Sequence, residues 1–164
     1  MLKKKVCMVG AFSVGKTSLV QRFVKSIFSD QYLTTVGVKI DKKSLDVDGN
    51  PVELLLWDIQ GEDELSKMRL TYLRGAAGLL LVVDGTRAST LDTALAIKAA
   101  ADESGETVPA IVLFNKSDLA PQWEIDDAAI AGVEARGLRT LRTSAKDGSG
   151  VEEAFVSLAR MTLG

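Results

Sequence analysis

Residues 10–17, GAFSVGKT, have the glycine spacing and the Lys-Thr ending of a P-loop. The segment follows an apolar run and precedes a segment of helical period, which is where a P-loop must lie. Its glycines let the backbone wrap closely around a polyphosphate, and the N–H groups and dipole of the following helix attract it. Lys16 is expected to reach the β- and γ-phosphates and Thr17 to bind Mg²⁺. A flexible glycine-rich turn is the alternative interpretation.

The sequence Asn-Lys-Ser-Asp at 115–118 follows a second apolar run and indicates which base is bound. A carboxylate accepts two hydrogen bonds, which suits N1–H and the exocyclic amine of guanine, whereas adenine has no N1 donor. Asp118 is therefore expected to bind guanine. Asn115 would fasten this loop to the P-loop, and the stem of Lys116 would cover the base. Taken alone, these residues could form a polar turn, but both motifs follow strands of one sheet, where ligands bind.

The pattern Asp-x-x-Gly occurs at 46–49, 58–61, 102–105 and 147–150, so only its context is informative. Asp58 follows a buried strand, whereas the other three fall on a hairpin, a helix terminus and a loop. Asp58 is thus the candidate carboxylate for holding the waters of Mg²⁺, and the N–H of Gly61 is a candidate donor to the γ-phosphate. The neighbouring Trp57 is interpreted as a core residue.

Apolar runs alternate with helical segments, which predicts an α/β fold around a largely parallel sheet. The expected strands are Lys4–Val9, Val38–Val47, Val52–Trp57, Gly78–Asp84, Ala110–Asn115 and Arg139–Thr143. The expected helices are Lys16–Lys25, Ser66–Tyr72, Thr90–Ser104, Asp126–Arg136 and Val151–Leu163. The second and third strands are joined through Asp48-Gly49-Asn50, a connection too short for a crossover helix, so they must form an antiparallel hairpin and the sheet is mixed.

Composition excludes several classes of function. The 164 residues fit one domain, 1–164, and 20 Lys and Arg against 22 Asp and Glu give no basic field for nucleic acid. The absence of histidine excludes Ser-His, Cys-His and His-metal chemistry built from this chain alone. A single cysteine and no signal-peptide pattern predict a cytoplasmic protein, and the longest apolar run, 75–83, is too short to span a membrane.

In their order and spacing these motifs resemble those of a Ras-superfamily small GTPase, closest in style to the Rab branch, over essentially the whole chain. The resemblance implies a single P-loop G domain with a six-stranded mixed sheet, five helices and strand order 2-3-1-4-5-6. It also implies a molecular switch that binds GTP or GDP with Mg²⁺ and hydrolyses GTP. Effectors, an exchange factor and an activating protein would bind its switch regions.

The resemblance adds several residues to the predicted site. Thr35 matches the switch I threonine that binds Mg²⁺ and contacts the γ-phosphate, and Ser144-Ala145-Lys146 resembles the loop that contacts guanine O6. Phe28 matches an aromatic residue at the guanine edge and Tyr32 a tyrosine that folds over the phosphates, although Phe28 could be core and Tyr32 merely exposed. The expected nucleotide-binding residues are Gly10, Ser13, Val14, Gly15, Lys16, Thr17, Ser18, Phe28, Thr35, Gly61, Asn115, Lys116, Asp118, Ser144, Ala145 and Lys146. The expected metal-binding residues are Thr17, Thr35 and Asp58, and the expected catalytic residues are Lys16, Thr35, Gly61 and Glu62.

Two departures from the family predict slow hydrolysis. Glu62 stands where the family has the glutamine that orients the attacking water, and it adds negative charge near the γ-phosphate. Phe12 replaces a small P-loop residue and would crowd the place of an arginine finger; it either packs against Leu65, Met68 or a partner, or is an idle surface residue. No arginine is an obvious built-in finger. The alternative function is a nucleotide-dependent binding module with negligible hydrolysis, and an ATP-using kinase would leave residues 115–118 unexplained.

The last residues, 161–164, contain no cysteine, so no prenyl anchor or other direct membrane anchor is expected, unless the native tail is missing from this chain. A monomer is the default expectation.

Overall fold

A computed structural model describes residues 2–25, 38–59, 67–105 and 107–163. The strands are β1 (Leu2–Gly10), β2 (Val38–Val47), β3 (Asn50–Ile59), β4 (Gly78–Asp84), β5 (Ala110–Asn115) and β6 (Arg139–Arg142). The helices are α1 (Lys16–Lys25), α2 (Lys67–Tyr72), α3 (Ser89–Glu103), the 3₁₀ helix η1 (Ser117–Gln122), α4 (Asp127–Glu134) and α5 (Val151–Leu163). None of the helices within these described ranges is long and apolar enough to cross a membrane.

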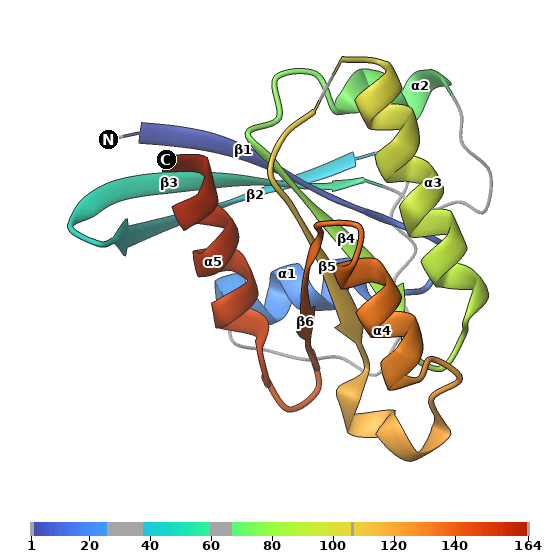
Figure 1. The fold of residues 1–164 in the computed structure, drawn as a ribbon. Coiled ribbons are helices and arrows are strands. Elements are labelled where there is room, and N and C mark those ends of the chain that lie inside the picture. Colours follow the sequence, from blue (N-terminus) through green and yellow to red (C-terminus); the bar gives the residue numbers. More distant parts are fainter. Residues whose placement is uncertain (1, 26–37, 60–66, 106, 164) are drawn as a thin grey trace.

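The six strands form one sheet in the order β2-β3-β1-β4-β5-β6 (Figure 1), which confirms the predicted α/β fold. The only antiparallel pair in this sheet is β2 with β3, and the other four pairs are parallel. Strands β4 and β5 are buried along their whole length, as expected for central parallel strands that are covered on both faces.

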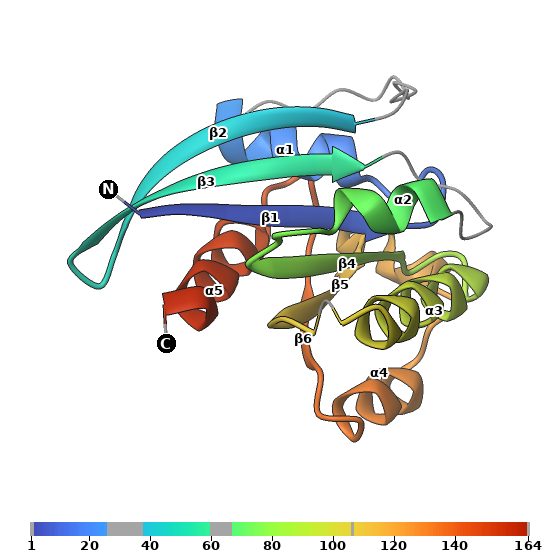
Figure 2. The same ribbon diagram turned by 90° about the horizontal axis from the view of Figure 1, so that it is seen from above.

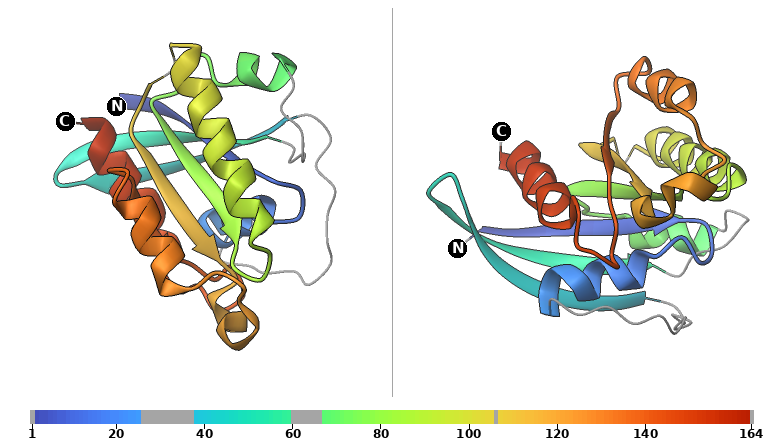
Figure 3. Two further views of the ribbon diagram at one scale, coloured as in Figure 1. Left: turned by 45° about the vertical axis from the view of Figure 1, so that its right-hand side comes forward. Right: turned by 90° about the horizontal axis from the view of Figure 1, so that it is seen from below.

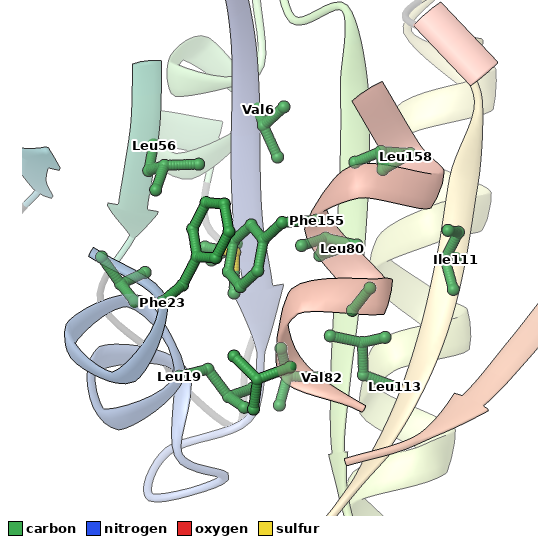
Figure 4. Packing of buried hydrophobic residues seen from close by; sticks show 14 of the residues in the cluster. Val6, Leu19, Phe23, Leu56, Leu80, Val82, Ile111, Leu113, Phe155 and Leu158 are labelled. Atoms are coloured by element: carbon green, nitrogen blue, oxygen red, sulfur yellow. The ribbon is translucent and has the colours of Figure 1, made fainter. Parts of the chain in front are cut away.

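Helices cover both faces of the sheet (Figure 2). One face packs against α1 and α5, and alternate residues of β1, such as Val6 and Met8, point to it. The intervening residues, such as Cys7 and Val9, point to the opposite core beneath α2, α3 and α4. On the first face, the rings of Phe23 and Phe155 stack with their centroids 4.2 Å apart and join α1 to α5 (Figure 4). This contact anchors the helix that follows the P-loop.

Several predicted boundaries were wrong by one or two residues. β3 extends beyond the expected Val52–Trp57 because β2 continues to pair with it through Val38 and Ile59. Helix α4 is shorter than Asp126–Arg136, since the Asp126 carboxylate caps it by accepting a hydrogen bond from the N–H of Ala129. The 3₁₀ helix η1 was not predicted, because its six residues are too few for a periodic pattern.

The tip of the β2–β3 hairpin lies beside α5 (Figure 3). Asp48 and Gly49 have φ of 53° and 86°, as a tight hairpin turn requires. Arg160 of α5 donates a hydrogen bond from Nε to the Asp48 carboxylate at 2.7 Å, and this bond lowers the pKa of Asp48. The contact is exposed and lies away from the loops that carry the sequence motifs.

The register of the parallel strands brings those motifs together. Gly10 at the end of β1 pairs with Val82, and Asp84 at the end of β4 pairs with Asn115. Because parallel strands end at the same edge, the P-loop, the β4–α3 connection and the loop after β5 become neighbours at the carboxyl edge of the sheet.

Candidate functional site

The P-loop connects β1 to α1 and requires its two motif glycines. Gly10 has φ 151° and a Cβ there would collide with the carbonyl oxygen of Val82. Gly15 has φ 104° and a Cβ would collide with the side-chain amide of Asn115. Both positions combine close contact with a backbone conformation that L-residues rarely adopt, so the motif is needed for the loop to fit against its neighbours.

Lys16 is the first residue of α1 and is 6% exposed. Its ammonium group donates hydrogen bonds to the carbonyl oxygens of Ala11 at 3.0 Å and Gly10 at 3.5 Å. The positive charge is therefore held over the turn of the P-loop, within the concavity where an anion would be bound.

Asn115 fastens the loop after β5 to the P-loop, as the sequence predicts. Its side-chain amide donates to the carbonyl oxygen of Val14 at 2.9 Å, and its amide oxygen accepts from the Thr143 hydroxyl at 3.0 Å. All of these polar groups are buried, so the hydrogen bonds also satisfy groups that water cannot reach. The P-loop, β5 and the segment after β6 are thereby joined.

Lys116 is held in place by contacts of both its side chain and its backbone. Its ammonium group binds the Asp84 carboxylate at 2.8 Å and the carbonyl oxygen of Ser13 at 3.2 Å. Its backbone has φ 68°, a left-handed conformation, and its own carbonyl oxygen accepts a hydrogen bond from the indole N–H of Trp123 at 2.8 Å. That indole also lies where a Cβ on Gly85 would collide with it, so the ring fills the space between two loops.

Asp118 and Ser144 meet across the predicted guanine site. The Ser144 hydroxyl donates to Asp118 Oδ1 at 2.7 Å, and the backbone N–H of Asp147 donates to Ser144 Oγ at 3.2 Å. Ser144 and Ala145 are buried, whereas Asp118 and Lys146 are exposed. The loop after β5 and the loop after β6 therefore present an accessible carboxylate whose position is set by a buried hydroxyl.

At the other end of the P-loop, the Thr17 hydroxyl donates to Asp58 Oδ2 at 2.5 Å. Asp58 is 1% exposed, and its Oδ1 has no hydrogen-bond partner in the structure described here. Burial raises the pKa of the Asp58 carboxyl above its usual value, against the opposing effects of the Thr17 hydrogen bond and the Lys16 charge. A buried carboxylate oxygen without a partner is a group that a hydrated cation would satisfy.

The Thr17 hydroxyl and the Asp58 carboxylate fit Mg²⁺, which prefers hard oxygen ligands and keeps several waters. Within the described ranges no group of three His, Cys, Asp or Glu side chains gathers into a metal site. A hydroxyl and one nearby carboxylate are consistent with a metal that takes its remaining ligands from phosphate and water rather than from a protein cage.

The neighbour of Asp58 in β3, Trp57, packs partly against the second core. The Lys5 ammonium group lies 3.7 Å from the centroid of its ring. This placement supports its interpretation as a core residue at the border of the site.

Several predicted residues lie outside the part of the chain that the structure describes. They are Phe28, Tyr32, Thr35, Gly61, Glu62 and Leu65. Phe12 is described and is 37% exposed at the turn of the P-loop. The predicted contact of Phe12 with Leu65 or Met68 stays a prediction.

Sequence reasoning missed two residues of the site, Asp84 and Arg87. Asp84 is 1% exposed at the end of β4, and Arg87 donates from Nη2 to the carbonyl oxygen of Phe12 at 2.7 Å. A carboxylate that ends a wholly apolar buried strand was the signal available in the sequence, since a buried charge must have partners. Nothing in the sequence marked Arg87 as the partner.

Comparisons with known proteins agree with this geometry. The model of the Ras family matches residues 5–163. The Ras-related protein Rab-13 of Canis lupus familiaris is 32% identical over 158 residues, which cover 95% of this chain and 78% of the relative. The GTP-binding protein yptV2 of Volvox carteri is 35% identical over 97% of this chain and 75% of its own length. The Ras-related protein SEC4 of Saccharomyces cerevisiae is 30% identical over 96% of this chain and 74% of its own length.

The P-loop, the Asn-Lys-Ser-Asp loop and the Thr17–Asp58 pair thus occupy one edge of a sheet whose strand order was expected for this family. The matched region covers nearly the whole chain, and the relatives are similar across the same span. The chain therefore belongs to the Ras family and is a Rab-like small GTPase, a switch that binds guanine nucleotide and hydrolyses GTP.

Proposed function

We propose that residues 1–164 form one G domain that binds its nucleotide in a defined orientation. The phosphates lie in the P-loop at Gly10, Ser13, Val14, Gly15, Lys16, Thr17 and Ser18. The base lies against Asn115, Lys116 and Asp118 and the segment Ser144, Ala145 and Lys146. The observation that carries the proposal is the Asn115–Val14 hydrogen bond, because it joins the base-binding loop to the phosphate-binding loop.

Thr17 and Asp58 are the described residues that would hold Mg²⁺, with Thr35 as a further proposed ligand. When bound, the ion would neutralise charge on the β- and γ-phosphate oxygens. The buried Asp58 Oδ1 without a partner supports this assignment. Lys16 would leave its contacts with P-loop carbonyls and bind phosphate oxygens, which are stronger acceptors for an ammonium group.

Hydrolysis uses water as the nucleophile, and we propose that its intrinsic rate is low. Glu62 occupies the position of the water-orienting glutamine, and Thr35 and Gly61 are the other proposed catalytic residues with Lys16. The 37% exposure of Phe12 supports a second candidate, a nucleotide-dependent binding module with negligible hydrolysis. An exposed phenyl group at that turn would occupy space that a catalytic side chain or an activating protein needs.

Members of this family act through effectors and regulators, and this chain is a switch of that kind. We further propose that it works as a monomer in the cytoplasm and contacts its effectors, exchange factor and activating protein through the segments around Thr35 and after Gly61. The buried thiol of Cys7, the single cysteine of the chain, is compatible with a reducing compartment.

Single-turnover hydrolysis of preloaded GTP with Mg²⁺ tests this proposal. Wild type is compared with Glu62→Gln and Phe12→Gly, and GTP binding is measured separately for each. Slow conversion by wild type and faster conversion by Glu62→Gln would support a slow switch. Persistent GTP in wild type with turnover in either variant would favour the binding module. Failure of wild type to bind GTP would contradict the proposed site itself.

A further inference from the structure

Three consecutive carbonyl groups of the P-loop each accept a hydrogen bond from a side chain outside the loop. Arg87 Nη2 donates to the oxygen of Phe12 at 2.7 Å, and Lys116 Nζ donates to the oxygen of Ser13 at 3.2 Å. Asn115 Nδ2 donates to the oxygen of Val14 at 2.9 Å. The donors come from the connection after β4 and from the last residue of β5 with the residue that follows it, so the loop is held from outside at three successive peptides.

This arrangement fixes the direction of the backbone N–H groups. The structure has no cis peptide bonds among the residues it describes, and in a trans peptide the C=O and the following N–H point in opposite directions. Carbonyl groups held toward the supporting loops therefore direct the N–H groups of Ser13, Val14 and Gly15 to the opposite side. Successive N–H groups that converge from a turn with positive φ, here at Ser13 and Gly15, form an anion-binding concavity.

Arg87 is itself held by a buried carboxylate. Asp84 Oδ2 accepts from Arg87 Nε at 3.0 Å and from Lys116 Nζ at 2.8 Å. The other oxygen, Oδ1, accepts from the backbone N–H and the hydroxyl of Thr86, at 2.9 and 2.7 Å. Both carboxylate oxygens are thus satisfied, and the guanidinium is oriented before it reaches Phe12. Its side chain is 41% exposed, which leaves it at the rim of the P-loop rather than inside the phosphate site.

We propose that Arg87 is a positioning residue for the nucleotide phosphates: it holds the Phe12 peptide so that the N–H of Ser13 stays directed at them. This inference rests on the proposed placement of the phosphates in the P-loop. Arg87 acts through the backbone and does not touch the nucleotide. A guanidinium suits the task because its fork binds two acceptors in fixed directions, whereas an ammonium group is a single point of donation.

The shared carboxylate has a further consequence. Because Asp84 binds both Arg87 and Lys116, it links the Phe12 peptide to the first residue after β5, which belongs to the base-binding loop. Loss of Arg87 leaves the Lys116 and Asn115 contacts in place. The expected defect is therefore confined to the phosphate end of the nucleotide.

The experiment measures release of a fluorescent GDP analogue from purified protein that carries Mg²⁺, and the ³¹P spectrum of bound GDP. Wild type is compared with Arg87→Ala, Arg87→Lys and, as a matched control, the exposed Arg136→Ala in the turn after α4. Arg87→Ala should release GDP about tenfold faster, the effect of one lost charge-assisted hydrogen bond, and should move the β-phosphate resonance. Arg87→Lys should be intermediate, and Arg136→Ala should match wild type. The preference for GDP over ADP should be unchanged in all four proteins.

A purely structural role would lower the melting temperature of Arg87→Ala without changing the release rate or the β-phosphate resonance, and that result would overturn the proposal. If Arg87→Ala does not fold, Arg87→Lys carries the test by the same two measurements, because it keeps the charge and loses only the fork. Wild type that binds no GDP would contradict the proposed site, a result distinct from a normal wild type with a normal Arg87 variant.

Discussion

On the guanine side of the site, Asn115, Lys116 and Asp118 are each held by hydrogen bonds or ion pairs within the chain. On the magnesium side, the Thr17 hydroxyl donates a hydrogen bond to Asp58, and one buried oxygen of Asp58 has no partner among the described residues. The two sides share one P-loop, yet among the described residues it is the magnesium side that keeps a buried carboxylate oxygen without a partner.

This difference indicates what each side contributes. The guanine side is preorganised, so selecting the base costs little further ordering. On the magnesium side, one carboxylate oxygen of Asp58 has no partner among the described residues, and burial raises the pKa of this carboxyl above its usual value. We therefore expect base selectivity to survive changes in metal, and phosphate binding to depend on them.

The largest expected effect comes from a substitution on the guanine side. Asp118→Asn replaces one acceptor of the base-binding carboxylate by a donor, so it should turn the preference from guanine toward xanthine. The ratio of GTP to XTP affinity should fall by roughly 1,000-fold, since two charge-assisted hydrogen bonds are affected. Competitive nucleotide titration measures it, and Asp126→Asn, beyond η1, is the control. An unchanged ratio would show that Asp118 does not contact the base.

Lys16→Ala tests the charge that both sides share. Removing a buried ammonium group should weaken GTP binding about 100-fold, without altering the preference for guanine over adenine. Calorimetric titration with GTP and ATP measures both quantities, and the exposed Lys25→Ala at the end of α1 provides the comparison. Equal GTP affinity for wild type and Lys16→Ala would contradict the assignment of the P-loop as the phosphate-binding site.

Chelation of Mg²⁺ sharpens the comparison without a mutation. Release of a fluorescent GDP analogue should accelerate on the order of tenfold in excess EDTA, because phosphate charge is no longer neutralised. The GDP-to-ADP preference should stay the same. A preference that collapses with the metal would show that the guanine side is not preorganised.

The smallest effect concerns acid stability. Burial alone would raise the pKa of Asp84, but hydrogen bonds from Lys116, Thr86 and Arg87 outweigh it and hold the pKa below the usual 3.8. Because the folded pKa is the lower one, this carboxylate stabilises the fold fully above the unfolded pKa, and the contribution disappears as pH falls through the folded pKa. The free energy of unfolding, measured with urea, should therefore fall more steeply below about pH 5 for wild type than for Asp84→Asn. Asp92→Asn on α3 should follow wild type, and equal slopes for all three proteins would contradict the role of Asp84.

The sequence predicted the strands and the motif loops, because periodicity and glycine spacing are local signals. The strand order was predicted from the resemblance to the Ras superfamily. The sequence also predicted the Asn115 attachment, which depends on a motif of known spacing. It could not predict that Asp84 binds Arg87 and Lys116 together. These two ion pairs join residues that follow different strands to the carboxylate at the end of β4. The register of the strands decides which cations lie near that carboxylate. The 3₁₀ helix η1 was not predicted because, although it is a local structure, it is too short to show a period in the sequence.

The chain contains two tryptophans, and they stand on opposite sides of the nucleotide site. Trp57 precedes Asp58 in β3, whereas the indole of Trp123 binds the carbonyl oxygen of Lys116. Intrinsic fluorescence therefore contains one emitter for each side. In a Trp57→Phe protein the remaining emission follows the base-binding loop, and in a Trp123→Phe protein it follows the strand beside the metal. The arrival of base and cation can then be timed separately in unlabelled protein.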